Sequence, residues 1–151
     1  MNWSSKSSIW LSRLCVVVFG LVALAILVSA PWLVKGFVQF SRAGLENKAE
    51  GLLLATIYTG GVPAVYILWL LWRLLDNIRA GKVFIPQNVQ LLRRISWGCI
   101  AGALICLASG LYYVLFFVIA ACAAFMALIV RVVKNVFQQA VLLQEDADYT
   151  I

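Results

Sequence analysis

The chain has 151 residues, of which 64% are hydrophobic and only 12% are charged, and its formal net charge is +6. Soluble domains are typically about 45–50% apolar and about 25% charged, so this composition excludes a disordered chain and argues against a water-soluble globule. Four cysteines, all within apolar runs, are too few for a secreted disulfide scaffold. The remaining class is an all-α integral membrane protein, and we expect residues 1–151 to form a single membrane domain.

An uncharged run at 14–34 predicts the first transmembrane helix, at 12–34. A helix of about 20 apolar residues crosses a hydrocarbon core of roughly 30 Å. A cleaved signal peptide is the alternative, because Lys6 and Arg13 resemble its charged start and 28–30 resembles a small-residue cleavage site. The apolar stretch is longer than the roughly 7–15 residues of a signal peptide, so we expect a retained helix.

The second uncharged run predicts a helix at 51–73, which Gly60, Gly61 and Pro63 interrupt. Proline removes one backbone donor and clashes with the preceding turn, so we expect a kink there. The kink is either a packing feature or a gating hinge. Threonines of the same helix are candidates for a polar seam, although such hydroxyls more often bond a backbone carbonyl or a neighbouring helix.

The segment 73–94 predicts an amphipathic helical loop with a turn in its middle. Gly81 is placed to end one helix with left-handed backbone, and Pro86 suits the first turn of the next helix. Ile85 is a poor N-cap, so we expect packing of Phe84 against the bilayer to fix this helix start.

A third uncharged run, 95–130, predicts a helical hairpin. Its 36 residues would form a single helix of about 54 Å, which needs a tilt outside the usual range of roughly 0–40°. We therefore expect two spans, at 92–110 and 113–136, joined by a tight turn near Ser109 and Gly110.

Small residues suggest how these two helices pack, because close approach drives helix association in lipid. The third helix has Gly98, Gly102 and Gly110 at spacings of four or eight, and the fourth has Ala120 and Ala124. We expect these two faces to meet in the hairpin.

The last helix is expected to continue as an amphipathic tail over 137–151. Ile129, Val133, Val136, Ala140 and Leu143 recur at spacings of three and four, as on one face of a helix. The tail is acidic and the loop before the third span is basic, so a weak contact between them is a further expectation, worth about 0–1 kcal/mol.

The distribution of basic residues predicts the topology. Four spans place both termini on one side, and nine of the twelve Lys and Arg residues fall on that side. A three-span arrangement divides them seven to five, which is a weaker bias. The positive-inside rule then predicts that both termini are cytoplasmic. Because the bases lie dispersed at helix ends, we expect no direct binding of nucleic acid.

Two motifs resemble those of a known family. The loop carries G-K-V-F at 81–84, then Asn88, then L-L-R-R-I at 91–95, which is similar to the pattern G-x-x-F…N…L-R-x-I. The chain end, Q-E-D-A-D-Y-T-I at 144–151, resembles an acidic stretch that closes in D-L-T-I, with Tyr149 in place of the leucine.

Together these motifs resemble the domain of unknown function 2975 family, which comprises small bacterial membrane proteins, over residues 10–151. The resemblance implies four spans in a bacterial inner membrane. It also implies a frequent gene neighbour that encodes a small Xre-type helix-turn-helix regulator, and it implies no known reaction.

The residues give no support for an enzyme. The sequence has no histidine, no acidic residue inside a predicted span and no CxxC motif. The usual acid–base residue, the commonest zinc ligand and the usual intramembrane proton relays are therefore missing from it. We expect no catalytic residue, no metal site and no cofactor.

The leading hypothesis is an interaction protein whose cytoplasmic face binds the small regulator. The candidate partner-binding residues are Phe84, Asn88, Arg93, Arg94, Asp148, Thr150 and Ile151. A transporter or channel component is the alternative, suggested by the interruption at 60–63, and it would require a homo-oligomer. An immunity-type membrane protein is a third possibility, which no residue favours.

Overall fold

In the computed structural model the chain forms four α-helices: α1 (Trp3–Phe40), α2 (Asn47–Arg79), α3 (Pro86–Ser109) and α4 (Leu115–Tyr149). The structure describes residues 3–40 and 47–150, with side chains from residue 7 and residue 49 onward, and these ranges contain no strand. Each helix is long and apolar enough to cross a membrane, by length and composition. The predicted all-α fold with four such helices is therefore confirmed.

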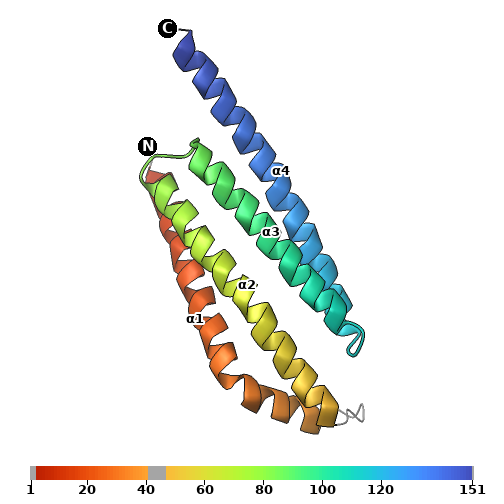
Figure 1. Cartoon of the computed structure of the whole chain (residues 1–151). Coiled ribbons are helices and arrows are strands. Elements are labelled where there is room, and N and C mark those ends of the chain that lie inside the picture. Colours follow the sequence, from red (N-terminus) through yellow and green to blue (C-terminus); the bar gives the residue numbers. More distant parts are fainter. Residues whose placement is uncertain (1–2, 41–46, 151) are drawn as a thin grey trace.

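The helices pack mainly on their neighbours in sequence. The contact of α3 with α4 is the most extensive, followed by those of α2 with α3 and of α1 with α2. Figure 1 shows that the start of α1, the α2–α3 turn and the end of α4 share one end of the bundle. We call this the terminal end. Which side of a membrane it faces stays a prediction.

The helices are longer than the predicted spans. α1 continues to Phe40 and α2 begins at Asn47, so most of the first predicted loop is helical. Charged residues such as Lys35 mark where the apolar run stops, but they do not break the local backbone hydrogen bonds that continue a helix. The turn predicted between the third and fourth spans is confirmed, because α3 ends at Ser109 and α4 begins at Leu115.

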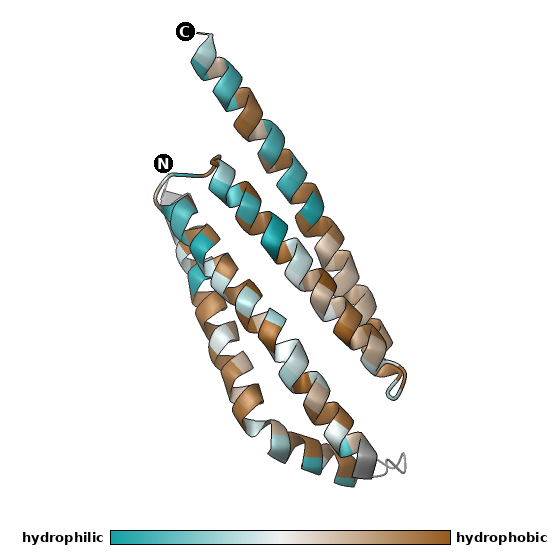
Figure 2. Cartoon of the chain, in the orientation of Figure 1, coloured by the Kyte–Doolittle hydropathy of each residue, from teal (hydrophilic) through white to brown (hydrophobic). Residues whose placement is uncertain are grey.

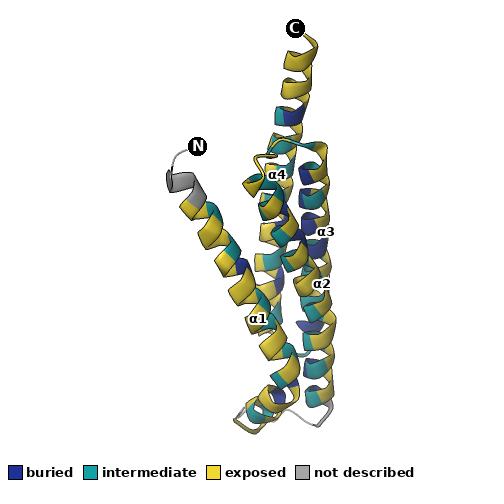
Figure 3. Ribbon diagram, turned by 90° about the vertical axis from the view of Figure 1, so that its left-hand side faces the viewer, coloured by how far each residue is buried: buried dark blue, intermediate teal, exposed yellow. Residues whose placement is uncertain are grey.

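Large apolar side chains cover the outside of the bundle. Figure 2 shows hydrophobic residues along the middle of the helices, with hydrophilic residues gathered toward the terminal end. Figure 3 shows that most of the surface of α1 is exposed. Trp32 on α1, for example, is 87% exposed. Such a surface is unfavourable in water and fits contact with lipid.

The buried core lies where α2, α3 and α4 meet. Leu70 and Leu74 of α2 pack against Leu92 and Ile95 of α3. Half-buried side chains of α4, among them Phe137, complete this cluster. The core therefore sits on the side of the bundle that supports the α2–α3 turn.

The bend that Figure 1 shows is in α1, in its C-terminal half. Pro31 lies inside this helix, and the Ser29 hydroxyl donates to the carbonyl of Ala25 at 2.6 Å. Both features bend helices, because proline removes a backbone hydrogen bond and a serine bonded four residues back perturbs the turn. α2 also contains a proline, Pro63, where we expected a kink, but Figure 1 shows no bend of this size in α2.

The glycines of α3 pack differently from our prediction. A Cβ on Gly98 would lie 2.8 Å from the Cγ1 of Ile67, so Gly98 faces α2 rather than α4. A Cβ on Gly102 would meet nothing within 4 Å. The predicted contact of Gly98 and Gly102 with α4 is therefore wrong. α3 contacts both α2 and α4, and its Gly98 faces α2. Gly110 does face α4, since a Cβ there would lie 2.7 Å from Phe117.

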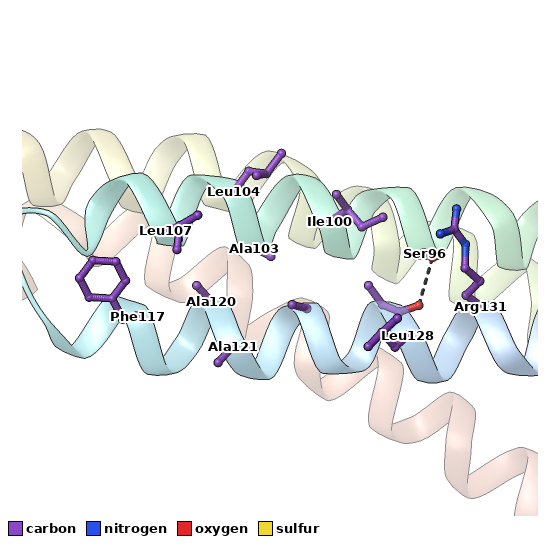
Figure 4. Close-up of a pocket in the computed structure, with 12 residues that line it drawn as sticks. Ser96, Ile100, Ala103, Leu104, Leu107, Phe117, Ala120, Ala121, Leu128 and Arg131 are labelled. Carbon is purple, nitrogen blue, oxygen red and sulfur yellow. Dashed lines mark hydrogen bonds between the residues drawn. The ribbon is translucent and has the colours of Figure 1, made fainter.

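The actual α3–α4 contact is a seam of other small residues. The Ser96 hydroxyl donates to the carbonyl of Ala127 at 3.1 Å (Figure 4). Ala120 is buried here, whereas Ala124 is exposed and lines a largely apolar groove of about 490 Å³ between the two helices. The predicted alanine face thus lies toward α3, but it meets Ser96, Ile100 and Ala103 instead of glycines.

Candidate functional site

The α2–α3 turn at the terminal end is built by backbone geometry that the sequence specifies. Gly81 has φ of 77°, and its N–H donates to the carbonyl of Ile78 at 3.0 Å. The N–H of Lys82 donates to the carbonyl of Asn77, also at 3.0 Å. This pair of bonds is the Schellman motif that ends a helix with glycine. Pro86 then occupies the first turn of α3, as predicted.

Asn88 holds this turn from inside. Its side chain is fully buried, and its Nδ2 donates to the carbonyls of Lys82 at 2.8 Å and Val83 at 2.7 Å. Its Oδ1 accepts a hydrogen bond from Nδ2 of Asn77 at 2.7 Å. We expected Asn88 to contact a partner. Its amide is instead hydrogen-bonded within the chain, so Asn88 holds the α2–α3 turn in place.

Phe84 packs against α4 and not only against lipid as we expected. The centroids of the Phe84 and Phe137 rings are 5.5 Å apart, and Phe84 remains 47% exposed. The contact joins the turn to the last helix, and it compensates for Ile85, which gives α3 no side-chain cap.

Arg93 and Arg94 are both exposed, but they lie in different surroundings. Arg93 lines a groove of about 310 Å³ between α3 and α4, together with Lys134 and Glu145, whereas Arg94 is not part of it. Of the two arginines, Arg93 is therefore the one that borders the space between α3 and α4.

The end of α4 projects beyond the rest of the bundle, as Figures 1 and 3 show. Val141 is the last buried residue, and every residue over 142–150 is exposed. Asp148 and Thr150 lie in this projection, where the Thr150 hydroxyl donates to the carbonyl of Asp146. Ile151 lies outside the described residues.

The apolar stripe predicted on α4 is the exposed one. Val136 is 57% exposed and Leu143 is 70% exposed. The residues of α4 that turn toward α3 include Phe137 and Val141. Each of them comes one position after a residue of the predicted stripe. The expected contact of acidic tail and basic loop is not formed by the described residues: the tail points away, and only Glu145 shares a groove with basic side chains.

A second charged group lies between α1 and α2 at the same end, and sequence analysis did not identify it as a site. Arg13 Nη1 is 3.4 Å from Asp76 Oδ1, and the Arg13 guanidinium carbon is 4.2 Å from the centroid of a Trp72 ring. Trp72 and Asp76 are four residues apart and share a helix face. That spacing was a usable signal, but the sequence does not show which part of α1 lies opposite.

Hydroxyl groups tie the opposite end of the bundle together. Thr56 Oγ1 hydrogen-bonds with the hydroxyls of Ser109, at 2.7 Å, and of Tyr112. The Tyr112 hydroxyl also donates to the carbonyl of Leu52 at 3.1 Å. Thr59 bonds within its own helix, to the carbonyl of Ala55. These hydroxyls therefore have structural partners and do not form a free polar seam.

No group of three or more potential ligands that could hold a metal ion occurs within the ranges that the structure covers. The four cysteines are free thiols on α1, α3 and α4.

Comparison with known proteins identifies the family but no function. No curated protein and no solved structure is significantly similar to the chain. A family described as "Protein of unknown function (DUF2975)" matches residues 5–151, which is nearly the whole chain. The motifs at the α2–α3 turn and at the chain end had pointed to the same family, and the chain belongs to the domain of unknown function 2975 family.

Proposed function

We propose that this chain is a non-enzymatic protein of the bacterial inner membrane that binds a soluble partner on the cytoplasmic side. The terminal end is the cytoplasmic face in this proposal, since it carries nine of the twelve basic residues. The partner is a small Xre-type helix-turn-helix regulator, which the family resemblance suggests. Binding would hold the regulator at the membrane and away from DNA.

The projection of α4 is the observation that carries the proposal. Arg131 and Lys134 are the first charged residues after the long uncharged run, so they mark the level of the lipid headgroups. The residues 142–149 stand beyond this level and beyond the other helices. Leu142 and Leu143 are 53% and 70% exposed there, which is costly unless something covers them.

The chemistry of the projection fits a basic partner. Glu145, Asp146 and Asp148 accompany the two leucines on an exposed helix. Such an amphipathic acidic helix suits an apolar groove with a basic rim, and DNA-binding domains carry basic surfaces. The same acidic residues would compete with DNA phosphates for that surface, so anchoring and inhibition would follow from one contact.

The transporter alternative has less support than the binding role. It relied on hydroxyls of α2 and on the interruption at 60–63. Thr56 and Thr59 are hydrogen-bonded within the bundle. A Cβ on Gly61 would lie 2.5 Å from Leu27 Cδ2, so this glycine has a packing role between α2 and α1. The binding role also explains why Leu142 and Leu143 are exposed, which a transporter role does not explain.

The test is a binding measurement between the purified full chain in lipid nanodiscs and a purified small Xre-type helix-turn-helix regulator, the partner that the proposal names. Leu143→Asp and removal of residues 148–151 should each weaken binding at least about tenfold, as expected for residues central to an interface. Arg93→Ala tests the adjoining groove. Lys35→Ala, at the other end of α1, is the control and should leave binding unchanged. Failure to bind, or equal binding by all variants, would contradict the proposal.

A further inference from the structure

A cleft opens between α1 and α2 at the terminal end. Figure 3 shows α1 diverging from the other helices toward its N-terminal end. The cleft has a volume of about 620 Å³ and is lined by Ile9, Trp10, Arg13, Leu14, Val17, Trp72 and Arg79. Two guanidinium groups and two indole rings therefore border a space whose remaining walls are aliphatic.

Arg13 is held in this cleft with hydrogen-bonding capacity to spare. Its side chain is 18% exposed, and the separation from Asp76 is 3.4 Å, longer than a normal charge-assisted hydrogen bond. Its Nη1 is buried without a hydrogen-bond partner. A guanidinium has five N–H donors, and a buried donor that lacks a hydrogen-bond acceptor is unfavourable even when its charge is partly balanced by a nearby carboxylate. An acceptor that enters the cleft would remove this cost.

The charges in the cleft select an anion. Its lining contains two arginines and no acidic residue. Asp76 lies beside Arg13 but is 62% exposed to solvent, so it offsets only part of the positive charge. Trp72 already stacks on Arg13, which fixes the guanidinium and reduces the entropy lost on binding.

The position and the walls select a lipid rather than a soluble ion. Arg13 immediately precedes the uncharged run of α1, and Arg79 is the last residue of α2, so both are at the level of lipid headgroups. Leu14 and Val17 continue the cleft from Arg13 along the apolar part of α1. Free phosphate would use the arginines alone, whereas an acyl chain would also cover these walls.

We propose that this cleft binds one anionic glycerophospholipid, with its phosphate between Arg13 and Arg79 and an acyl chain along Leu14 and Val17. The inference does not depend on the proposed partner of α4. α1 contacts the other helices mainly through α2. The proposed lipid would fill the space between α1 and α2.

Native mass spectrometry of the full chain in detergent tests this inference, with phosphatidylglycerol and phosphatidylcholine of identical acyl chains as probes. We expect tighter binding of phosphatidylglycerol. Arg79→Gln should weaken its binding about fivefold, as expected for loss of one basic contact near a membrane surface. Arg13→Gln should weaken it further, but this variant also breaks the pair with Asp76, so Arg79→Gln is the decisive one.

Arg73→Gln is the matched control, because Arg73 stacks over Trp69, 5.1 Å from its ring centroid, and is not part of the cleft. It should bind phosphatidylglycerol like the unmodified chain. Inorganic phosphate at millimolar concentration should not displace the lipid. Equal binding of the two lipids, equal effects of Arg79→Gln and Arg73→Gln, or displacement by free phosphate would each overturn the proposal.

Discussion

The side-chain amide of Asn77 on α2 donates a hydrogen bond to that of Asn88 on α3, with 2.7 Å between Nδ2 and Oδ1. The Nδ2 of Asn88 also donates to two carbonyls of the intervening turn. One buried side chain therefore connects the end of one helix, the turn and the start of the next.

Asn88→Ala should destabilise the protein by about 1–3 kcal/mol, because it leaves Asn77 and two carbonyls without their partner. The midpoint of thermal unfolding in detergent measures the effect. Asn135→Ala is the control, since Asn135 is exposed on α4. Equal midpoints for the two variants would contradict the role assigned to Asn88.

The two glycines of α3 should respond differently to alanine. Gly102→Ala has space for its methyl group and should be as stable as the unmodified chain or more stable, because alanine favours helix. Gly98→Ala places a methyl group against Ile67 and should be less stable than Gly102→Ala by about 1–3 kcal/mol. Thermal unfolding of the pair checks this order. The reverse order would mean that Gly98 does not contact α2.

The contact of Phe84 with Phe137 should appear as a coupling energy. Aromatic pairs contribute about 0.5–1.5 kcal/mol beyond the area they bury. A double-mutant cycle of Phe84→Ala and Phe137→Ala, measured by unfolding, should give a value in that range. Additive effects of the two changes would show that the turn is not joined to α4.

The hydroxyl cluster at the other end of the bundle should also be measurable. Thr56→Val removes bonds to Ser109 and Tyr112 and should cost about 0.6 kcal/mol, the average for hydrogen bonds between helices in membranes, and at most about 1.7 kcal/mol for each bond. Thr59→Val is the matched control, since Thr59 bonds only carbonyls of α2, and it should cost less.

The predicted topology requires that residue 150 be cytoplasmic. In a background whose four native cysteines are replaced by serine, Thr150→Cys should react with an impermeant maleimide only after cells are permeabilised. Lys35→Cys should react in intact cells. The opposite pattern would invert the orientation and remove the basis for a cytoplasmic partner.

The sequence specified those features that depend on local chemistry. The three apolar runs, the division of the last one into a hairpin, the helix end at Gly81 and the helix start at Pro86 follow from hydropathy, length and backbone geometry within a few residues. Each is found in the structure where it was expected. Segments that follow a charged residue were harder to assign, since charge ends an apolar run but not a helix.

Features that depend on which helices are neighbours could not be predicted. Gly98 lies on a face of small residues, and nothing in the sequence shows whether α2 or α4 covers that face. Asn88 looked like a surface residue because it is polar, but the turn folds over it. The cleft at Arg13 requires the approach of two helices about 60 residues apart in sequence, which periodicity does not reveal.

The dominance of contacts between consecutive helices bears on how the protein is made. A chain whose spatial neighbours are its sequence neighbours has low contact order, which favours rapid folding. As the chain leaves the ribosome, each new helix finds its main support in the one inserted just before it. The α3–α4 hairpin, with the largest contact, would then complete assembly and close the core last.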